Sequence, residues 1–312
     1  MSSKTTTQSI EPGLLSGELG EFFAVLLRYG HRLKQVANYT QLDLIAMGVA
    51  GVVTVMLLLG LPPSPAPLVI AFVTFAVYVG DRISDTKREP EATSARSQFM
   101  NRYKTPLSIA SAGAYGLAIT VSVFGGPLAL AITLVPGLSW VLYASDFLNG
   151  TGLPISRLKR VLVLNSAIVG VAWATAIVFL PIAFANAEIG PIAVVLFAYF
   201  ALDIFLGTEI PNFRDIEDDI ANDVRSLPIV FGITRSRHII YTINVLIVGV
   251  LLFAFTTELL SVAFIGAALV GRAYAVTLHG FVGRTDRYRL LEFFGEMKHV
   301  LVVIVFAGLL FA

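Results

Sequence analysis

Long apolar runs separated by short polar segments fill the chain from residue 42 to its end. Most of these runs approach the ~20 residues that a helix needs to cross the hydrocarbon core of a bilayer. Two runs, 66–80 and 297–312, are shorter, and we expect them to continue as helix into the polar loops that follow. The pattern predicts an all-α fold, a polytopic membrane helical bundle of about nine transmembrane helices, at residues 42–61, 66–80, 105–124, 127–144, 161–181, 189–208, 238–257, 259–278 and 297–312.

The segment before the first run has a different pattern. Residues 1–17 are polar and rich in Ser, Thr and Gly, without the charged-then-apolar order of a signal peptide, and we expect a disordered tail. Residues 18–39 place an apolar stripe opposite Arg28, Arg32 and Lys34, which is typical of a helix lying at a membrane interface. Packing of this helix on a soluble partner is the alternative. Residues 18–312 are predicted to form a single membrane-embedded domain.

Composition supports the membrane class. Hydrophobic residues make up 56% of the chain, charged residues 14%, and the mean hydropathy is +0.80. These values lie outside those of soluble globular domains. The chain has no cysteine, which excludes disulfides, thiolate nucleophiles and zinc–thiolate sites.

The distribution of basic residues predicts the orientation. All of the 22 Lys and Arg residues except Arg272 lie in the N-terminal segment or in alternate connections, and this count places Lys298 in the last of those connections. The connections near residues 62, 126, 186 and 258 carry none. By the positive-inside rule, the N-terminus and the long loops face the cytoplasm. We therefore expect a multi-pass protein of the cell membrane.

Two acidic segments follow the second and sixth predicted spans. Asp81 and Asp85 are four residues apart, as are Asp215 and Asp219. On a helix, carboxylates at this spacing share one face and repel each other unless a cation lies between them. Oxygen ligands suit magnesium or calcium, whereas an acidic solvated loop is the alternative for either segment alone. Arg and Lys side chains occur in both segments, and carboxylates interleaved with such cations suit a magnesium–diphosphate ligand.

At these residues the chain resembles the UbiA superfamily of intramembrane prenyltransferases, of the archaeal and bacterial type. Asp81, Asp85 and Glu89 fall on the Asn-xxx-Asp-xxx-Asp motif of that family, and Asn212, Asp215 and Asp219 fall on its second, Asp-xx-Asp-xxx-Asp motif. Further family-like segments are Gly207-Thr-Glu209-Ile210, Arg225-Ser-Leu-Pro228 with Gly232, Tyr143, Arg157-Leu-Lys159-Arg160, Asn165 and Trp173.

The resemblance implies a magnesium-dependent enzyme that transfers an isoprenyl group from an allylic isoprenyl diphosphate to a lipophilic acceptor within the membrane, by ionisation of the diphosphate. No nucleic-acid partner is implied. The implied catalytic residues are Asp85, Asp215 and Asp219. The implied metal ligands are Asp81, Asp85, Glu89, Asn212, Asp215 and Asp219, and the implied diphosphate contacts are Arg82, Tyr143, Lys159, Arg160, Asn165 and Arg225.

Four positions depart from the family pattern. Asp81 stands where Asn is usual, Glu89 and Asn212 where Asp is usual, and Leu164 where Lys is common before Asn165. These changes fit a specialised acceptor or reduced activity, so a catalytically inactive lipid-binding relative remains an alternative. A secondary transporter is another, although transporters concentrate polar residues near the membrane midplane rather than at helix ends.

Other polar residues receive structural interpretations. Arg272 lies within the eighth span but close enough to its end to extend to the interface, and Asp43 is expected to cap the first span. Asp203 lies one turn from the cytoplasmic end of the sixth span, close to Glu209, and its membership of a polar cavity there is left open. The four His residues, His31, His238, His279 and His299, show no metal-ligand spacing.

Overall fold

The computed structural model of the chain describes residues 41–88, 95–144, 164–221 and 224–312, and these residues belong to one compact unit. The expected tail at 1–17 and the expected interfacial helix at 18–39 lie outside the described residues. Within them the structure is helical, with no strand. The helices are α2 (Leu42–Leu58), α3 (Ala66–Arg88), α4 (Ala95–Arg102), α5 (Lys104–Val123), α6 (Gly126–Ala144), α7 (Leu164–Phe184), α8 (Pro191–Glu209), η3 (Pro211–Phe213), α9 (Ile216–Ala221), α10 (Leu227–Thr256), α11 (Val262–His279) and α12 (Tyr288–Phe311).

The helical membrane bundle predicted from the sequence is confirmed. In the described part of the chain, seven helices are long and apolar enough to cross a membrane, judged by length and composition. Two shorter apolar helices, Leu42–Leu58 and Gly126–Val141, complete the predicted set. Short helices α4 and α9 lie in connections that were expected to be loops.

The helix boundaries differ from the prediction at two starts. α3 continues into its polar segment as expected, but the last helix extends in the opposite direction and begins at Tyr288 rather than at Met297. Similarly, α10 begins at Leu227 rather than at His238. At the start of α12, buried Tyr288 stands between Arg287 and Arg289, whereas the apolar first turn of α10 is followed by a polar stretch that contains Arg235 and Arg237. A hydropathy window averages the two faces, so an amphipathic first turn looks like a loop.

α10 carries a break close to its start. Gly232 has φ 74° and ψ 161°, which separates the first turn from the rest of the helix. Only glycine adopts this conformation at little cost, because any Cβ would clash with the backbone. The first turn of α10, which contains Pro228, therefore runs in a different direction from the long part of the helix that follows Gly232.

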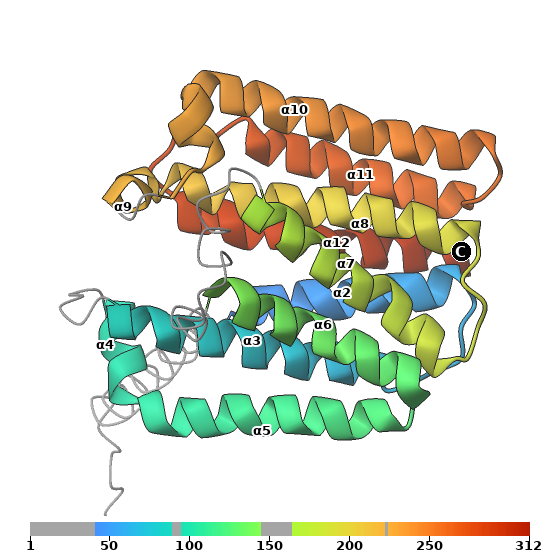
Figure 1. Cartoon of the computed structure of the whole chain (residues 1–312). Coiled ribbons are helices and arrows are strands. Elements are labelled where there is room, and N and C mark those ends of the chain that lie inside the picture. Colours follow the sequence, from blue (N-terminus) through green and yellow to red (C-terminus); the bar gives the residue numbers. More distant parts are fainter. Residues whose placement is uncertain (1–40, 89–94, 145–163, 222–223) are drawn as a thin grey trace, which may run out of the picture. The chain divides into compact units, whose positions relative to one another are not determined.

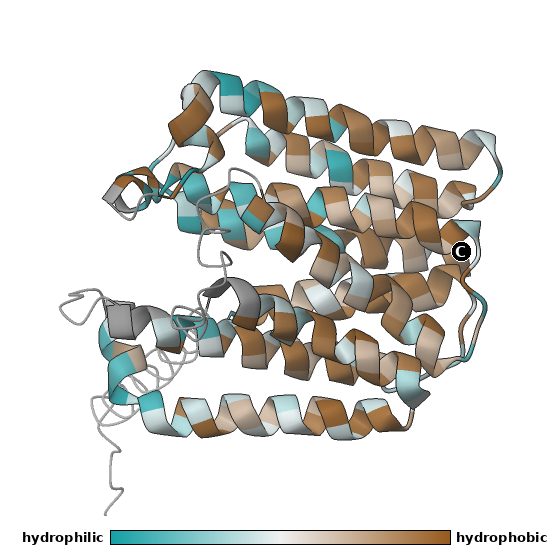
Figure 2. Cartoon of the chain, in the orientation of Figure 1, coloured by the Kyte–Doolittle hydropathy of each residue, from teal (hydrophilic) through white to brown (hydrophobic). Residues whose placement is uncertain are grey.

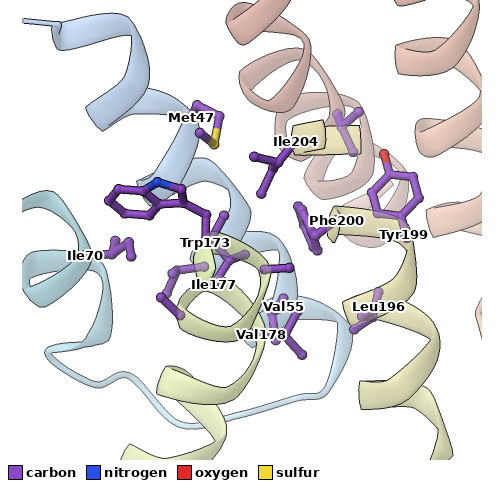
Figure 3. Packing of buried hydrophobic residues seen from close by; sticks show 14 of the residues in the cluster. Met47, Val55, Ile70, Trp173, Ile177, Val178, Leu196, Tyr199, Phe200 and Ile204 are labelled. Carbon is purple, nitrogen blue, oxygen red and sulfur yellow. The ribbon is translucent and has the colours of Figure 1, made fainter. Parts of the chain in front are cut away.

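The apolar core lies between α2, α3, α7 and α8. Figure 3 shows side chains from these helices interdigitating, among them Val55, Ile177 and Phe200, all nearly inaccessible to solvent. Close helix approach depends on small residues: a Cβ on Gly170 of α7 would lie 2.8 Å from the carbonyl oxygen of Ala201 on α8. Such small-residue contacts are a usual means of packing helices in membranes.

The polar parts of the described chain gather at one end of the bundle. Hydrophilic residues concentrate where α3 leads to α4 and where α8 leads through α9 to α10, whereas the helix bodies are mostly hydrophobic (Figures 1 and 2). We call this end, at which α8 ends and α10 and α12 begin, the motif end. α2 packs against both α3 and α12, and α12 also packs against α8 and α11, so α2 and α12 together link α3 to α8.

An apolar groove of about 500 Å³ lies between α2, α3 and α5. Its lining includes Ile45, Phe72 and Leu117 and contains no charged residue. Such a surface suits hydrocarbon chains, and the chemistry has to be sought at the motif end.

Candidate active site at the motif end

The second acidic segment forms a tight helical connection after α8. η3 follows α8 directly, and α9 begins one residue after Asp215. The backbone N–H of Asp219 donates to the carbonyl of Asp215 at 2.8 Å, so the two residues stand one helical turn apart. The predicted i, i+4 relationship between these two carboxylates is therefore realised.

Asn212 is held by a buried acid. Its side-chain nitrogen donates to Oε2 of Glu209 at 3.0 Å, and Glu209 is 1% exposed. The side chain of Ser166 on α7 and the backbone of Leu227 on α10 also hydrogen-bond to the Glu209 carboxyl. Glu209 therefore joins the ends of α7, α8 and α10. Because its nitrogen is committed to Glu209, Asn212 presents its amide oxygen, the atom that could serve a metal.

Arg214 forms a bidentate ion pair with Asp215. Its Nε donates to Oδ1 at 2.6 Å and its Nη2 donates to Oδ2 at 2.7 Å. The third nitrogen, Nη1, donates to Oε1 of Glu292 on α12 at 2.5 Å. Hydrogen bonding to Asp215, supported by the charge of Glu292, raises the pKa of Arg214 above its ordinary value, so this guanidinium stays charged.

Glu292 was missed at the level of sequence. It lies in a stretch that hydropathy assigned to a connection, whereas the structure places it on the second turn of α12. The signal that could have found it is the pattern of Tyr288 and Leu291, which marks an amphipathic helix start with Glu292 beside its buried face.

The first acidic segment continues α3. Asp81 and Asp85 both lie on this helix, one turn apart. The indole Nε1 of Trp140 on α6 donates to Oδ1 of Asp81 at 3.1 Å, which fixes that carboxylate. The side chain of Asp85 and the whole of Glu89 lie outside the described residues.

Charged residues of both segments act on Glu292 of α12. Glu292 binds Arg214, which holds Asp215, and the positive charge of Arg82 on α3 also acts on the Glu292 carboxyl. Arg82 also contacts Gln41, whose amide oxygen, in the orientation that satisfies both groups, accepts from Nε and Nη2 at 3.1 and 3.2 Å.

Of the other diphosphate contacts named from the sequence, two have described side chains. Asn165 near the start of α7 and Arg225 just before α10 are both exposed, and both can therefore be reached by an anion from solvent. Lys159 and Arg160 lie outside the described residues, as does the side chain of Tyr143.

The donor set suits a magnesium ion. Asp81, Asp215, Asp219 and the amide of Asn212 offer only oxygen atoms, the ligands that magnesium prefers. Among the described residues, no three acidic or His side chains stand close enough to hold a metal in their present positions. The Arg214 guanidinium places a positive charge directly beside the Asp215 carboxylate.

A second charged cluster lies inside the bundle, and the sequence reasoning did not assemble it. Asp203 of α8 is 0% exposed and is contacted by Arg272 of α11 and by Lys298 and His299 of α12, which are 3%, 4% and 4% exposed. Lys298 Nζ lies 3.0 Å and His299 Nε2 2.9 Å from Oδ2 of Asp203, while Arg272 binds Oδ1. We call these four residues the buried cluster.

The buried cluster extends to α10. Arg272 Nη1 donates to Oδ1 of Asn244 at 3.0 Å, and Nδ2 of Asn244 lies 3.0 Å from Nδ1 of His279. The ring of His299 stacks on Phe200, with centroids 5.8 Å apart. Four helices, α8, α10, α11 and α12, are thus tied together by polar contacts in an otherwise apolar interior.

Three interpretations from the sequence are therefore wrong. Arg272 does not extend to the interface, because Asp203 holds it inside the bundle. Lys298 is not a loop residue, and His279 and His299 are not scattered, since both join the same network. The available signal was the presence of ionisable residues within apolar helices, which usually pair with one another.

Asp43 also differs from expectation. The residue at the N-cap of α2 is Gln41, and no side chain caps this helix. Asp43 instead lies in the first turn, where it acts electrostatically on Glu296 of α12. It belongs to the acidic surroundings of the motif end.

Comparison with known proteins agrees with this arrangement. The sequence matches the UbiA prenyltransferase family over residues 81–302. No curated protein matches it significantly. The fold matches that of a digeranylgeranylglyceryl phosphate synthase, with a TM-score of 0.59 at 18% identity, covering 89% of this chain and 100% of that one.

Two archaeal structures show the same fold. A UbiA homologue from Archaeoglobus fulgidus, solved with GPP and Mg²⁺, has a TM-score of 0.64 at 11% identity and covers 89% of this chain and 100% of its own. A UbiA homologue from Aeropyrum pernix K1 has a TM-score of 0.63 at 13% identity and covers 87% of this chain and 98% of its own. The family match spans most of the chain and includes both acidic segments, and the helical bundle that carries them is shared: the chain belongs to the UbiA prenyltransferase family.

Proposed function

We propose that this prenyltransferase moves an isoprenyl group from an allylic isoprenyl diphosphate to a lipophilic acceptor within the membrane, with Mg²⁺ at the motif end. The observation that carries the proposal is the contact of Glu292 on α12 with Arg214, which holds Asp215, together with the effect of the Arg82 charge of α3 on the same Glu292 carboxyl. Related structures from Archaeoglobus fulgidus contain GPP or DMAPP together with Mg²⁺, which supports the same ligand class here.

In this proposal, both motifs hold the metal. The side chains are Asp81, Asp85, Glu89, Asn212, Asp215 and Asp219. When bound there, Mg²⁺ supplies positive charge that stabilises the diphosphate as it leaves the allylic carbon. Trp140 orients Asp81 and Glu209 orients Asn212, so contacts within the protein position two of the six proposed metal-binding side chains.

Cationic and polar side chains around the motif end are proposed to bind the diphosphate. They are Arg82, Tyr143, Lys159, Arg160, Asn165 and Arg225. Guanidinium groups suit this role because their paired donors match the spacing of phosphate oxygens. The allylic cation left after ionisation needs protection from water, which the apolar bodies of the helices exclude.

The orientation is part of the proposal. With Lys298 removed from the count of loop cations, the remaining Lys and Arg residues still favour a cytoplasmic motif end. The chain lacks cysteine, so single cysteines give clean reporters. Asp286→Cys, exposed before α12, should be labelled only from the cytoplasmic side, and Ala187→Cys, exposed between α7 and α8, only from outside. The reverse pattern would contradict the orientation.

The metal-dependent binding of an allylic diphosphate tests the function without knowledge of the acceptor. Purified protein should bind geranyl diphosphate in the presence of Mg²⁺ and lose that binding in EDTA. Asp85→Asn with Asp215→Asn should reduce binding and turnover by far less than the product of the single effects, because ligands of one metal act as a unit. Asp286→Asn removes an exposed acid at the same end of the bundle and is the matched control.

The two alternatives have distinct outcomes in this assay. An inactive lipid-binding relative would bind geranyl diphosphate and never release diphosphate from it. A transporter would bind without dependence on both acidic motifs. The buried cluster does not favour transport, because its ionisable groups are paired with one another and only 0–4% exposed.

A further inference from the structure

The contact between Arg214 and Asp215 uses the carboxylate oxygens that a metal ion would bind. The guanidinium covers both carboxylate oxygens, at 2.6 Å and 2.7 Å. These oxygens offer the lone pairs that a divalent cation would use, so Arg214 and Mg²⁺ compete for the same atoms. The pair neutralises Asp215 at the position where the proposed function requires a metal ligand.

The pair is exposed enough to exchange. The side chain of Arg214 is 29% exposed and that of Asp215 is 35% exposed. Ion pairs with this access to water contribute little net free energy, since water solvates the separated groups. A divalent cation can displace such a partner without leaving a charge buried and uncompensated.

Glu292 gives the displaced guanidinium a fixed place. It accepts from Nη1 of Arg214 at 2.5 Å and is carried by α12 rather than by the α8–α10 connection. When Asp215 is taken by a metal, this contact still anchors Arg214 at the motif end. The two nitrogens that are freed, Nε and Nη2, form a fork that fits phosphate oxygens.

We propose that Arg214 and Mg²⁺ alternate at Asp215: Arg214 gives Asp215 up to Mg²⁺ and then binds the diphosphate, with Glu292 holding it in reach. This inference rests on the proposed function, because it assumes a magnesium–diphosphate ligand. It adds two residues to that site, Arg214 as a diphosphate ligand and Glu292 as its positioning residue. It also predicts effects of opposite sign on the two ligands.

Removing the guanidinium separates the two effects. In Arg214→Gln, Mn²⁺ alone, measured by EPR on the purified protein, should bind about threefold to tenfold more tightly, because its competitor for Asp215 is gone. Geranyl diphosphate, measured calorimetrically with saturating Mg²⁺, should bind about tenfold or more weakly, because a charge-assisted contact to phosphate is lost. A residue needed only for folding would weaken both.

A conservative variant and a control complete the experiment. Arg214→Lys keeps the charge but loses the fork, and should shift both affinities in the same directions by smaller factors. Arg284→Gln removes an exposed cation from the same end of the bundle and should leave both affinities unchanged. If Arg214→Gln does not yield folded protein, Arg214→Lys carries the same pair of measurements.

The possible outcomes test the exchange at Asp215 separately from the proposed function. Weaker binding of both ligands in the Arg214 variants, with normal binding by the parent chain, overturns the exchange and leaves the proposed function standing. Absence of Mg²⁺-dependent geranyl diphosphate binding in the parent chain overturns both. Tighter Mn²⁺ binding with weaker diphosphate binding supports both.

Discussion

Two arginine–aspartate pairs lie close to each other in sequence and differ in their access to water. Asp203 lies in the last part of α8 and Asp215 in the connection that follows it, and each binds an arginine. The pair at the motif end is 29% and 35% exposed, whereas Arg272 and Asp203 are 3% and 0% exposed. The chemistry of the pairs is the same, and their surroundings give them different roles.

Solvent decides whether such a pair can open. Separating charges in the low-dielectric interior of the bundle costs several kcal/mol per ion, so the buried cluster has to stay paired and serves to join helices. At the motif end, water or a ligand can replace either partner. The buried cluster therefore fixes α12 relative to α8 and α11, and the exposed pair, in the connection between η3 and α9, is left to exchange.

The largest expected effect comes from breaking the buried pair. Asp203→Asn leaves Arg272 and Lys298 inside the bundle without their carboxylate, and should lower the free energy of unfolding by about 3–5 kcal/mol. Thermal unfolding of the purified protein in detergent measures this. The double variant Asp203→Asn with Arg272→Gln should lose less than the sum of the single losses, because the two residues share one interaction. A single variant as stable as the parent would contradict the assigned role of the cluster.

The exposed pair should show the opposite profile, a large loss of function with a small loss of stability. Asp215→Asn is expected to lower turnover of geranyl diphosphate about 10²–10³-fold, the usual cost of removing one well-placed electrostatic group. Its unfolding free energy should change by less than about 1 kcal/mol, because Arg214 can be solvated when its partner is removed. Turnover and thermal unfolding of the same preparation give both values. A stability loss as large as that of Asp203→Asn would remove the distinction between the two pairs.

The smallest expected effect is at Glu292. Glu292→Gln keeps the shape of the side chain and removes the charge that anchors Arg214. Since the Glu292 side chain is 25% exposed, the unfolding free energy should fall by about 1 kcal/mol or less. The same variant should weaken Mg²⁺-dependent binding of geranyl diphosphate several-fold, less than any change at Asp215. Unchanged diphosphate binding would show that Arg214 does not need this anchor.

The fold was predictable because its signal is local. Each long apolar helix corresponds to a run of apolar residues in the sequence, and every run that was predicted as a span forms a helix. The start of α12 was misplaced because buried Tyr288 stands between Arg287 and Arg289, and periodicity rather than mean hydropathy would have placed it. The start of α10 was misplaced because the polar residues 234–238 interrupt the apolar run that begins at Leu227.

The site was only partly predictable. The spacing of Asp215 and Asp219 could be read from the sequence, since it reflects one turn of helix. Glu292 and the buried cluster could not, because their partners lie about 70 residues or more away along the chain and meet only when α12 packs on α8. The pairing of Arg214 with Asp215 was also not predicted, because a contact between neighbouring side chains depends on the local backbone conformation rather than on composition.

The most direct test of the account is spectroscopic detection of a metal bound to both a diphosphate and Asp215. With Mn²⁺ in place of Mg²⁺ and geranyl diphosphate added, pulsed EPR of the purified protein should reveal hyperfine coupling of the bound metal to phosphorus. Asp215→Asn should abolish or strongly reduce that signal, and Asp286→Asn should not. A bound Mn²⁺ without phosphorus coupling, or a coupling unaffected by Asp215→Asn, would contradict a magnesium–diphosphate site at the motif end.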